Sequence, residues 1–192
     1  MADTAAAAEA YAQRLGWRVF PVREDGRTPM IKGGCHAATA DPAEIRRLWA
    51  ERPGVNLALA CGPESGVFVL DVDRHGDQDG FQSLAVLEDE FGQLPQTWRQ
   101  ATPNHGEHLF FRHPAGRELR NRQKLYVERR GGQRDIYPGL DVRTACAWRL
   151  SSAPGGAACA GRRRRGTGCG PRGRPGTAAG GPTANSPRPW PR

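Results

Sequence analysis

Residues 67–73, with the sequence Val-Phe-Val-Leu-Asp-Val-Asp, are the stretch from which the fold is best inferred. Residues 67–70 are apolar on both alternating faces, which is typical of a central strand covered on both sides. Asp71 and Asp73 are two positions apart, so on a strand their carboxylates share one face while Val72 points to the other. We therefore predict a buried strand that carries two acidic side chains together at its end.

Patterns of apolar and turn-forming residues predict the elements around this strand. Helices are expected between Asp3 or Thr4 and Gly16, from Asp41 to about Glu51 with a capping box of Asp41 and Glu44, and over 79–91. Strands are expected over 17–20, ending at Pro21, and over 56–60, 67–73, 98–102, 108–112 and 140–143, with 147–150 as a continuation of the last. This order predicts a mixed α/β (α+β) fold with local hairpins, in place of a regular parallel doubly wound sheet.

The chain has 192 residues and a net charge of +8, and that excess belongs to the C-terminal tail, residues 151–192. The tail contains eight Arg and no acidic residue, so residues 1–150 are formally neutral and we expect no basic DNA-binding face on the folded part. The tail is rich in Gly, Arg, Pro and Ala and has no large aliphatic residue, so it cannot form a core. We expect one folded domain, residues 7–150, followed by a disordered tail, 151–192.

The sequence carries no sign of a membrane or secreted protein. It has no apolar run long enough for a transmembrane helix, and residues 1–4 lack the basic start of a signal peptide. Five Cys residues are scattered without a Cys-x-x-Cys pair, which favours reduced thiols over a disulfide framework. We expect a cytoplasmic protein with no membrane partner.

The pair Asp71 and Asp73 is the strongest chemical signal in the sequence. Two anions a few ångströms apart repel each other and need a cation or a raised pKa. Mg²⁺ or Mn²⁺ would meet that need, since hard cations take carboxylate oxygens and share their ligand shell with substrate phosphates; a solvated turn is the simpler alternative. A calcium loop is a second alternative, since Asp71, Asp73, Gly76, Asp77 and Asp79 fall at positions 1, 3, 6, 7 and 9 of an EF-hand register. It is disfavoured because His75 and Gln82 occupy the ligand positions 5 and 12, and because the residues before Asp71 are predicted to form a strand.

Two further segments add polar side chains suited to a phosphate site. Gly106 and His108 share a face, where glycine would let a phosphate approach the backbone and histidine could donate to a phosphate oxygen. The alternative is a hairpin turn with an incidental histidine. Asp141 and Arg143 also share a face, and a surface ion pair is the alternative there.

Together these segments resemble the N-terminal domain of bifunctional DNA primase/polymerases, the prim-pol branch of the archaeo-eukaryotic primase superfamily. The similar segments cover about residues 7–150 in the family's order: 10–22 (Gly-Trp-Arg-Val-Phe-Pro at 16–21), 26–29 (Gly-Arg-Thr-Pro), 38–41 (Ala-Thr-Ala-Asp), 56–62 (Asn-Leu-Ala-Leu-Ala-Cys-Gly), 70–73 (Leu-Asp-Val-Asp), the segment around His108, and 139–143 (Gly-Leu-Asp-Val-Arg). The resemblance implies an RRM-like catalytic sheet with an N-terminal α/β part. It also implies that Asp71, Asp73 and Asp141 are catalytic and hold Mg²⁺ or Mn²⁺, and that His108, Gly106 and Arg143 bind the nucleotide.

The activity that the resemblance implies is that of a DNA primase/polymerase, a nucleotidyltransferase of DNA replication. A 3′-hydroxyl, or a first nucleotide's hydroxyl, would attack the α-phosphate of a nucleoside triphosphate on a single-stranded DNA template. No Walker A motif is present, so a helicase would be a separate partner. The alternatives are a non-catalytic nucleic-acid binder that uses the run Arg162–Arg165, and an inactive remnant of a primase/polymerase.

The sequence departs from the family in three places. Arg27 replaces the usual Lys, and His105-Gly106-Glu107 stands where the family has a Gly-Gly pair. After Arg143 the family continues through an apolar, glycine-rich strand, whereas this chain drifts into Arg, Gly, Ala and Pro. We hypothesise that the chain runs out of frame soon after Arg143, which would leave the last core strand missing or improvised. Translating the gene in its other two frames tests this, and the absence of an apolar continuation there would refute it.

Overall fold

The computed structural model describes residues 3–23 and 28–150, and the expectations for Arg27 and for the tail fall outside this part. The helices are α1 Thr4–Leu15, the short 3₁₀ helix η1 Gly34–Ala37, α2 Pro42–Ala50 and α3 Gly80–Phe91. The strands are β1 Val19–Val22, β2 Asn56–Cys61, β3 Val67–Val72, β4 Arg74–His75, β5 Gln78–Asp79, β6 Trp98–Ala101, β7 Glu107–Arg112, β8 Tyr126–Glu128, β9 Arg134–Ile136, β10 Leu140–Arg143 and β11 Cys146–Leu150. The fold is mixed α+β, as the sequence predicts.

The larger sheet contains four antiparallel strands in the order β10-β3-β7-β6. Numbered along the chain, these strands lie in the order 4-1-3-2, which is the order of an RRM-like sheet, and α3 joins the first to the second. β3 is central and buried at all but one residue, because one face packs against α3 and the other against the core of the smaller sheet. The prediction of a doubly covered central strand is therefore confirmed.

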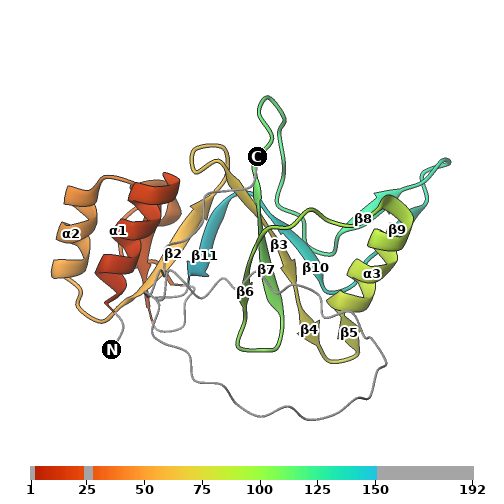
Figure 1. The fold of residues 1–192 in the computed structure, drawn as a ribbon, viewed down its shortest axis with the longest axis horizontal. Coiled ribbons are helices and arrows are strands. Elements are labelled where there is room, and N and C mark those ends of the chain that lie inside the picture. The colour runs from red at the N-terminus through yellow and green to blue at the C-terminus, as the bar shows by residue number, and fades with distance from the viewer. Residues whose placement is uncertain (1–2, 24–27, 151–192) are drawn as a thin grey trace, which may run out of the picture.

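The smaller sheet has three antiparallel strands in the order β1-β2-β11 and packs against α1 and α2. Figure 1 shows α1 and α2 at one end of the molecule, the sheets in the middle, and α3 with the β8–β9 hairpin at the other end. One apolar cluster joins the two sheets, since Leu57 and Leu59 of β2 share it with Val67 and Val69 of β3. Both sheets therefore contribute side chains to one core, and that core holds the larger sheet in place.

The ends of the helices follow the predicted caps, with one exception. The Asp3 carboxylate accepts hydrogen bonds from the first turn of α1, and Gly16 ends that helix in the left-handed conformation. Asp41 caps α2 in the same way, but Glu44 binds Arg47 instead of completing the capping box. In a capping box the Asp41 N–H would donate to the Glu44 carboxylate, but here it donates to the Thr39 hydroxyl.

Several strands differ from the prediction. β1 runs through Pro21, because β1 is at the edge of its sheet and a missing N–H there breaks no ladder bond. β11 does not continue β10 but pairs with β2 in the other sheet. The β4–β5 and β8–β9 hairpins were not predicted, since strands of two or three residues show too little alternation to be recognised.

The structure also bears on the expectations for the cysteine thiols and for membrane-spanning helices. Cys61 is buried with a free thiol, but Cys35 is disulfide-bonded, so the expectation of reduced thiols throughout is wrong. Spacing along the chain does not reveal which thiols a fold brings together. None of the helices in the described part of the chain combines the length and the apolar character needed to cross a membrane.

Candidate active site

Three polar side chains form one row across three neighbouring strands of the larger sheet. The pairing register sets Asp141 of β10 opposite Asp71 of β3, and Asp71 opposite His108 of β7. Directly opposed residues of antiparallel strands project to the same face. The Nε2 atom of His108 lies 3.5 Å from Oδ1 of Asp71. The structure thus brings together three predicted site residues that are far apart in the sequence.

Asp73 lies just beyond the end of β3 and is held through its backbone. Its N–H donates to the Gly139 carbonyl at 2.8 Å, and its own carbonyl accepts from the Gly80 N–H at 2.8 Å. Both glycines are required, because a Cβ on Gly80 would lie 2.3 Å from the Gly139 oxygen and a Cβ on Gly139 would lie 2.6 Å from the Gly80 nitrogen. The start of α3 and the start of β10 therefore fix Asp73 beside Asp71.

Asp71 is the most buried acid of the site, with only 2% of its surface exposed. The pKa of Asp71 is raised to about 7, mainly by burial and also by the negative charges of Asp73 and Asp141, while Arg143 opposes the rise. Among the described residues, no group donates a hydrogen bond to its Oδ1 atom. This carboxylate is therefore poised to take a cation or a proton.

Asp141 forms an ion pair with Arg143 on the same face of β10. The distance between Arg143 Nη2 and Asp141 Oδ2 is 2.6 Å, and the backbone N–H of Lys124 donates to Asp141 Oδ1 at 2.8 Å. Leu140 is fully buried and Val142 packs with the same cluster against α3. The predicted arrangement, with the acid and the cation on one face and the apolar residues on the other, is present.

His108 is neutral at physiological pH. Its pKa is lowered to about 4, mainly by burial and also by the positive charge of Arg143. A neutral imidazole has one N–H donor and one acceptor nitrogen. His108 can therefore donate one hydrogen bond to a phosphate oxygen without carrying a charge into the site.

Gly106 is buried in the turn that precedes β7. Its N–H donates to the Thr102 hydroxyl at 3.0 Å. A Cβ at this position would lie 2.5 Å from the Val72 carbonyl oxygen and 3.3 Å from Asp73 Oδ1. The glycine thus lets the turn pack against the end of β3, and its contact with a phosphate stays a prediction.

The donor set at this site suits a hard divalent cation, because it consists of carboxylate oxygens. No group of three acidic or histidine side chains in the described part of the chain is placed to hold an ion as it stands. The Asp141 carboxylate is directed at Arg143 and Lys124, whereas Asp71 keeps a buried oxygen without a donor. Binding of Mg²⁺ or Mn²⁺ therefore stays a prediction, and it would require Asp141 to exchange Arg143 for the ion.

The calcium-loop alternative is excluded by the fold of this segment. Asp71 is part of a strand, and the residues after Asp73 form the tight β4–β5 hairpin. Asp79 accepts a hydrogen bond from the Phe81 N–H and so caps α3. The segment therefore lacks both the preceding helix and the open loop of an EF-hand.

Two residues of the site were missed by the sequence analysis. Gln100 of β6 lies opposite His108, on the face that carries Asp71. Gln100 lies two positions after Trp98, so the period of a strand could have predicted that the two side chains share a face. Lys124 has a φ of 56° and gives its N–H to Asp141, and no local pattern predicts that contact.

The fold and the site define an α+β protein with an RRM-like sheet and a partly buried acidic site on one face. Residues 8–174 match the family described as bifunctional DNA primase/polymerase, N-terminal. Because the match covers most of the chain, the chain belongs to this family, and the family implies primase/polymerase-type nucleotidyltransferase activity in general. No curated protein matches the chain.

Proposed function

We propose that this protein is a DNA primase/polymerase-type nucleotidyltransferase that uses nucleoside triphosphates, Mg²⁺ or Mn²⁺ and a single-stranded DNA template in DNA replication. The observation that carries the proposal is the row of Asp141, Asp71 and His108 beside Asp73. The buried position of Asp71 among like charges gives that row a need for a cation. A cytoplasmic location and a separate helicase partner belong to the same proposal.

Each site residue has a role in the proposed reaction, in which a hydroxyl displaces pyrophosphate from the α-phosphate of a nucleoside triphosphate. Asp71, Asp73 and Asp141 would hold the divalent ion, which would neutralise charge on the phosphate oxygens. His108 donates an N–H to the triphosphate and orients it beside Asp71. Arg143, freed from Asp141, offers paired donors to a second phosphate oxygen. The rate enhancement then comes mainly from positioning and charge neutralisation.

Nucleotide incorporation on a single-stranded template tests the proposal. Asp71→Asn, Asp73→Asn and Asp141→Asn should each lower metal-dependent incorporation by about a hundredfold or more, because each removes a charge that the transition state needs. Asp77→Asn is the matched control, since Asp77 is an exposed acid in the nearby β4–β5 turn. The proposal fails if the wild-type chain incorporates nothing with either metal, or if the three site variants are as active as Asp77→Asn.

A further inference from the structure

A basic segment lies beside the candidate site, in the part of the chain that is neutral overall. Residues 112–134 contain eight Arg or Lys residues and only two Glu. Residues 1–150 hold equal numbers of basic and acidic residues, so the rest of that region is acidic. Neutrality over the folded part therefore hides a strong local excess of positive charge.

Part of this segment gathers two guanidinium groups over one ring. The Cζ atoms of Arg122 and Arg134 lie 4.0 and 4.5 Å from the centre of the Tyr126 ring. Arg134 also pairs with Glu128 at 3.0 Å, whereas Arg122 has no carboxylate partner among the described residues. We call Arg122, Lys124, Tyr126 and Arg134 the arginine–tyrosine surface.

The arginine–tyrosine surface begins at the edge of the candidate site. Arg122 exchanges two backbone hydrogen bonds of 2.8 Å with Val142 of β10, which lies between Asp141 and Arg143. Lys124 donates its N–H to Asp141. The segment thus runs along the outer side of β10, the last strand of the larger sheet.

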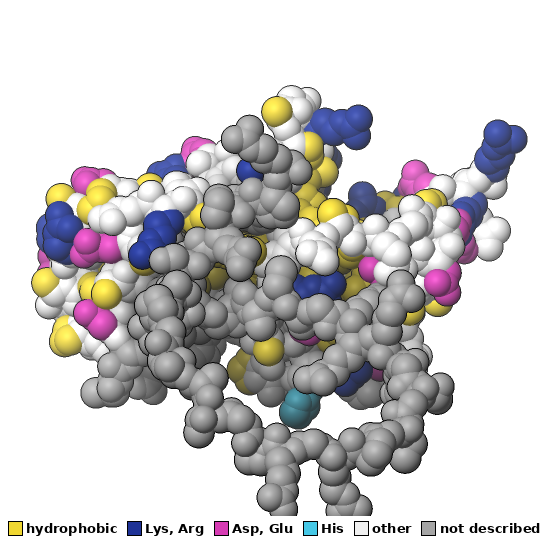
Figure 2. Space-filling view, viewed as in Figure 1, with side chains coloured by type: hydrophobic (Ala, Val, Ile, Leu, Met, Phe, Trp, Pro, Cys, Tyr) yellow, Lys and Arg dark blue, Asp and Glu magenta, His cyan; other side chains and the backbone are white. Residues whose placement is uncertain are grey.

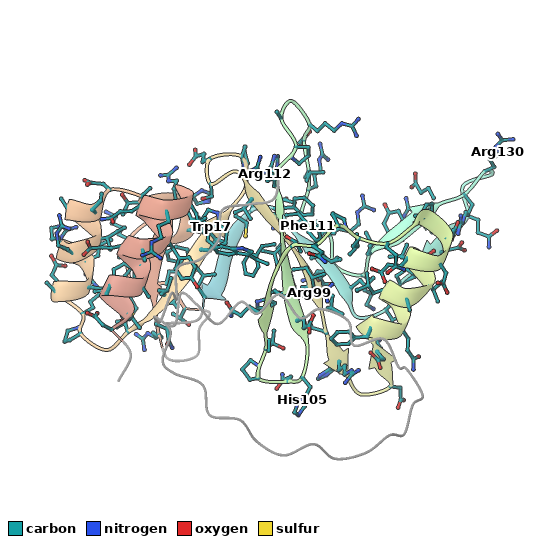
Figure 3. All side chains as sticks on the ribbon, viewed as in Figure 1. Trp17, Arg99, His105, Phe111, Arg112 and Arg130 are labelled. Atoms are coloured by element: carbon teal, nitrogen blue, oxygen red, sulfur yellow. The ribbon has the colours of Figure 1, made fainter. Side chains whose placement is uncertain are left out.

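The hairpin presents this surface away from α3. Val127 packs with the apolar cluster against α3, so its neighbour Tyr126 projects to the other face of β8. Arg129 binds Glu90 of α3 at 2.7 Å and Asp135 of β9 at 2.5 Å, which holds the hairpin on the helix. Arg130 stands at the tip of the hairpin, clear of the rest of the molecule (Figure 3).

The distribution of charge along the chain favours this region as a place where an anion binds. Figure 2 shows dark blue Lys and Arg side chains at the outer end of the hairpin with magenta side chains nearby, and blue and magenta side chains also alternate over α1 and α2 at the opposite end. The ion pairs of α2, such as Arg47 with Glu44 and Glu51, account for that alternation. The basic residues of the folded part are therefore concentrated in residues 112–134, although that part is neutral overall.

We propose that the arginine–tyrosine surface binds the phosphate backbone of the single-stranded DNA that enters the candidate site, an inference that rests on the proposed function. A guanidinium offers planar, paired donors that match a phosphate, and its flat face can stack on a base. Contact with the Tyr126 ring holds both guanidinium groups in place before the ligand arrives. Bound phosphates would pair with these cations, and the course of the segment along β10 leads the strand toward Asp141.

Binding of labelled oligothymidylate to the full-length chain, followed by fluorescence anisotropy over a series of salt concentrations with a chelator present, tests the inference. The double variant Arg122→Gln/Arg134→Gln should bind about tenfold more weakly. Its salt dependence should fall by about 1.4 in the log–log slope, which corresponds to two lost phosphate contacts. The matched control Arg14→Gln/Arg46→Gln removes the same charge from α1 and α2 and should leave the slope unchanged. Every variant retains the eight Arg of the tail, so their contribution cancels.

A second pair of variants tests whether the Tyr126 ring contributes to binding in addition to the positive charges. Tyr126→Leu removes the ring that supports both guanidinium groups and should weaken binding, whereas Tyr126→Phe keeps the ring and should bind as wild type does. Thermal melts check that each variant folds. The inference is overturned if Arg122→Gln/Arg134→Gln loses no more affinity and slope than the helix control, or if Tyr126→Leu binds as well as Tyr126→Phe.

The result can be distinguished from failure of the proposed function. Asp71→Asn should abolish incorporation and retain oligothymidylate binding, because it leaves the arginine–tyrosine surface intact. If the wild-type chain incorporates no nucleotide and the surface variants still lose binding, the DNA-binding surface is supported and the proposed enzymatic function is not. If incorporation occurs and the surface variants bind normally, the proposed enzymatic function is supported and the DNA-binding surface is not.

Discussion

Asp71 is the residue at which burial and like charge act together. Its carboxylate lies under the sheet surface, next to Asp73 and opposite Asp141, so its charged form is disfavoured in the folded protein. The unfolded chain has no such penalty. The free energy of unfolding must therefore depend on pH through this side chain.

We expect the stability of the metal-free protein to fall as pH rises from about 4 to about 7 through Asp71. The pKa of Asp71 is about 7 in the folded state and near its ordinary value of 3.8 in the unfolded state, so the folded state binds more protons in this window. Its contribution is complete below the ordinary pKa and is lost as pH rises through the folded pKa. Asp71→Asn should remove this loss, which is on the order of a few kcal/mol. Urea unfolding with a chelator measures it, and a variant with the pH slope of wild type would contradict the prediction.

His108 should show the opposite dependence. Its pKa is about 4 in the folded state against an ordinary value of 6.5, so the unfolded state binds more protons between these values. The contribution of His108 to the free energy of unfolding is complete above the ordinary pKa and is lost as pH falls toward 4. His108→Gln should therefore flatten the acid side of the stability curve, and the exposed His36→Gln should not. Equal curves for both histidine variants would show that His108 is not held neutral by the fold.

At the scale of elements, the site depends on the junction where β3 ends, α3 begins and β10 begins. Gly80 and Gly139 bring three backbone segments into contact around Asp73. The conformation of Gly139, with a φ of 74°, also favours glycine. The placement of one catalytic candidate is thus a property of three elements together.

Gly139→Ala should destabilise the protein more than Gly66→Ala. Both residues have positive φ, at 74° and 63°, but a Cβ on Gly139 would meet backbone at 2.6 Å, whereas a Cβ on Gly66 meets nothing within 4 Å. We expect a loss of about 1 kcal/mol at Gly66 from backbone conformation alone, and of about 3 kcal/mol or more at Gly139. Denaturant unfolding of the two variants checks this, and equal losses would rule out the close approach.

The elements differ in how far the sequence predicts them. β3 and the three α-helices are predictable because apolar period and capping residues are local signals. The passage of β1 through Pro21 is not, since it depends on β1 being an edge strand, which only the assembled sheet decides. The β8–β9 hairpin is held on α3 by Arg129 and Glu90, a contact between residues that no local pattern connects.

At the scale of the whole molecule, Trp17 links the two sheets. Its ring stacks on Tyr11 of α1 and on Phe110 of β7, with ring centroids 5.5 and 5.4 Å apart, and it meets Trp98 of β6 edge-on at 5.8 Å. Only 1% of Trp17 is exposed. The smaller sheet and its helices therefore stabilise the sheet that carries the site.

Trp17→Ala should lower the free energy of unfolding by about 3–5 kcal/mol and should loosen both sheets together, because they share one core. Hydrogen exchange of β2 and β7 amides measures this, and both sets should lose protection by similar amounts. Trp98→Ala, at a half-buried position on the edge strand, should cost less. Full protection of β7 in a Trp17→Ala chain that has lost protection in β2 would mean that the sheets fold independently.

By itself, the sequence determined the central strand, the helix caps and the face that each acidic side chain shares with its near neighbours. These depend on periodicity and on hydrogen bonds within a few residues. Only the tertiary structure decided that Asp141 lies opposite Asp71, that β11 joins the other sheet, and that Arg122 and Arg134 both contact the ring of Tyr126. Register between strands distant in the chain is selected by packing and by close backbone contacts, and neither is written in any single segment.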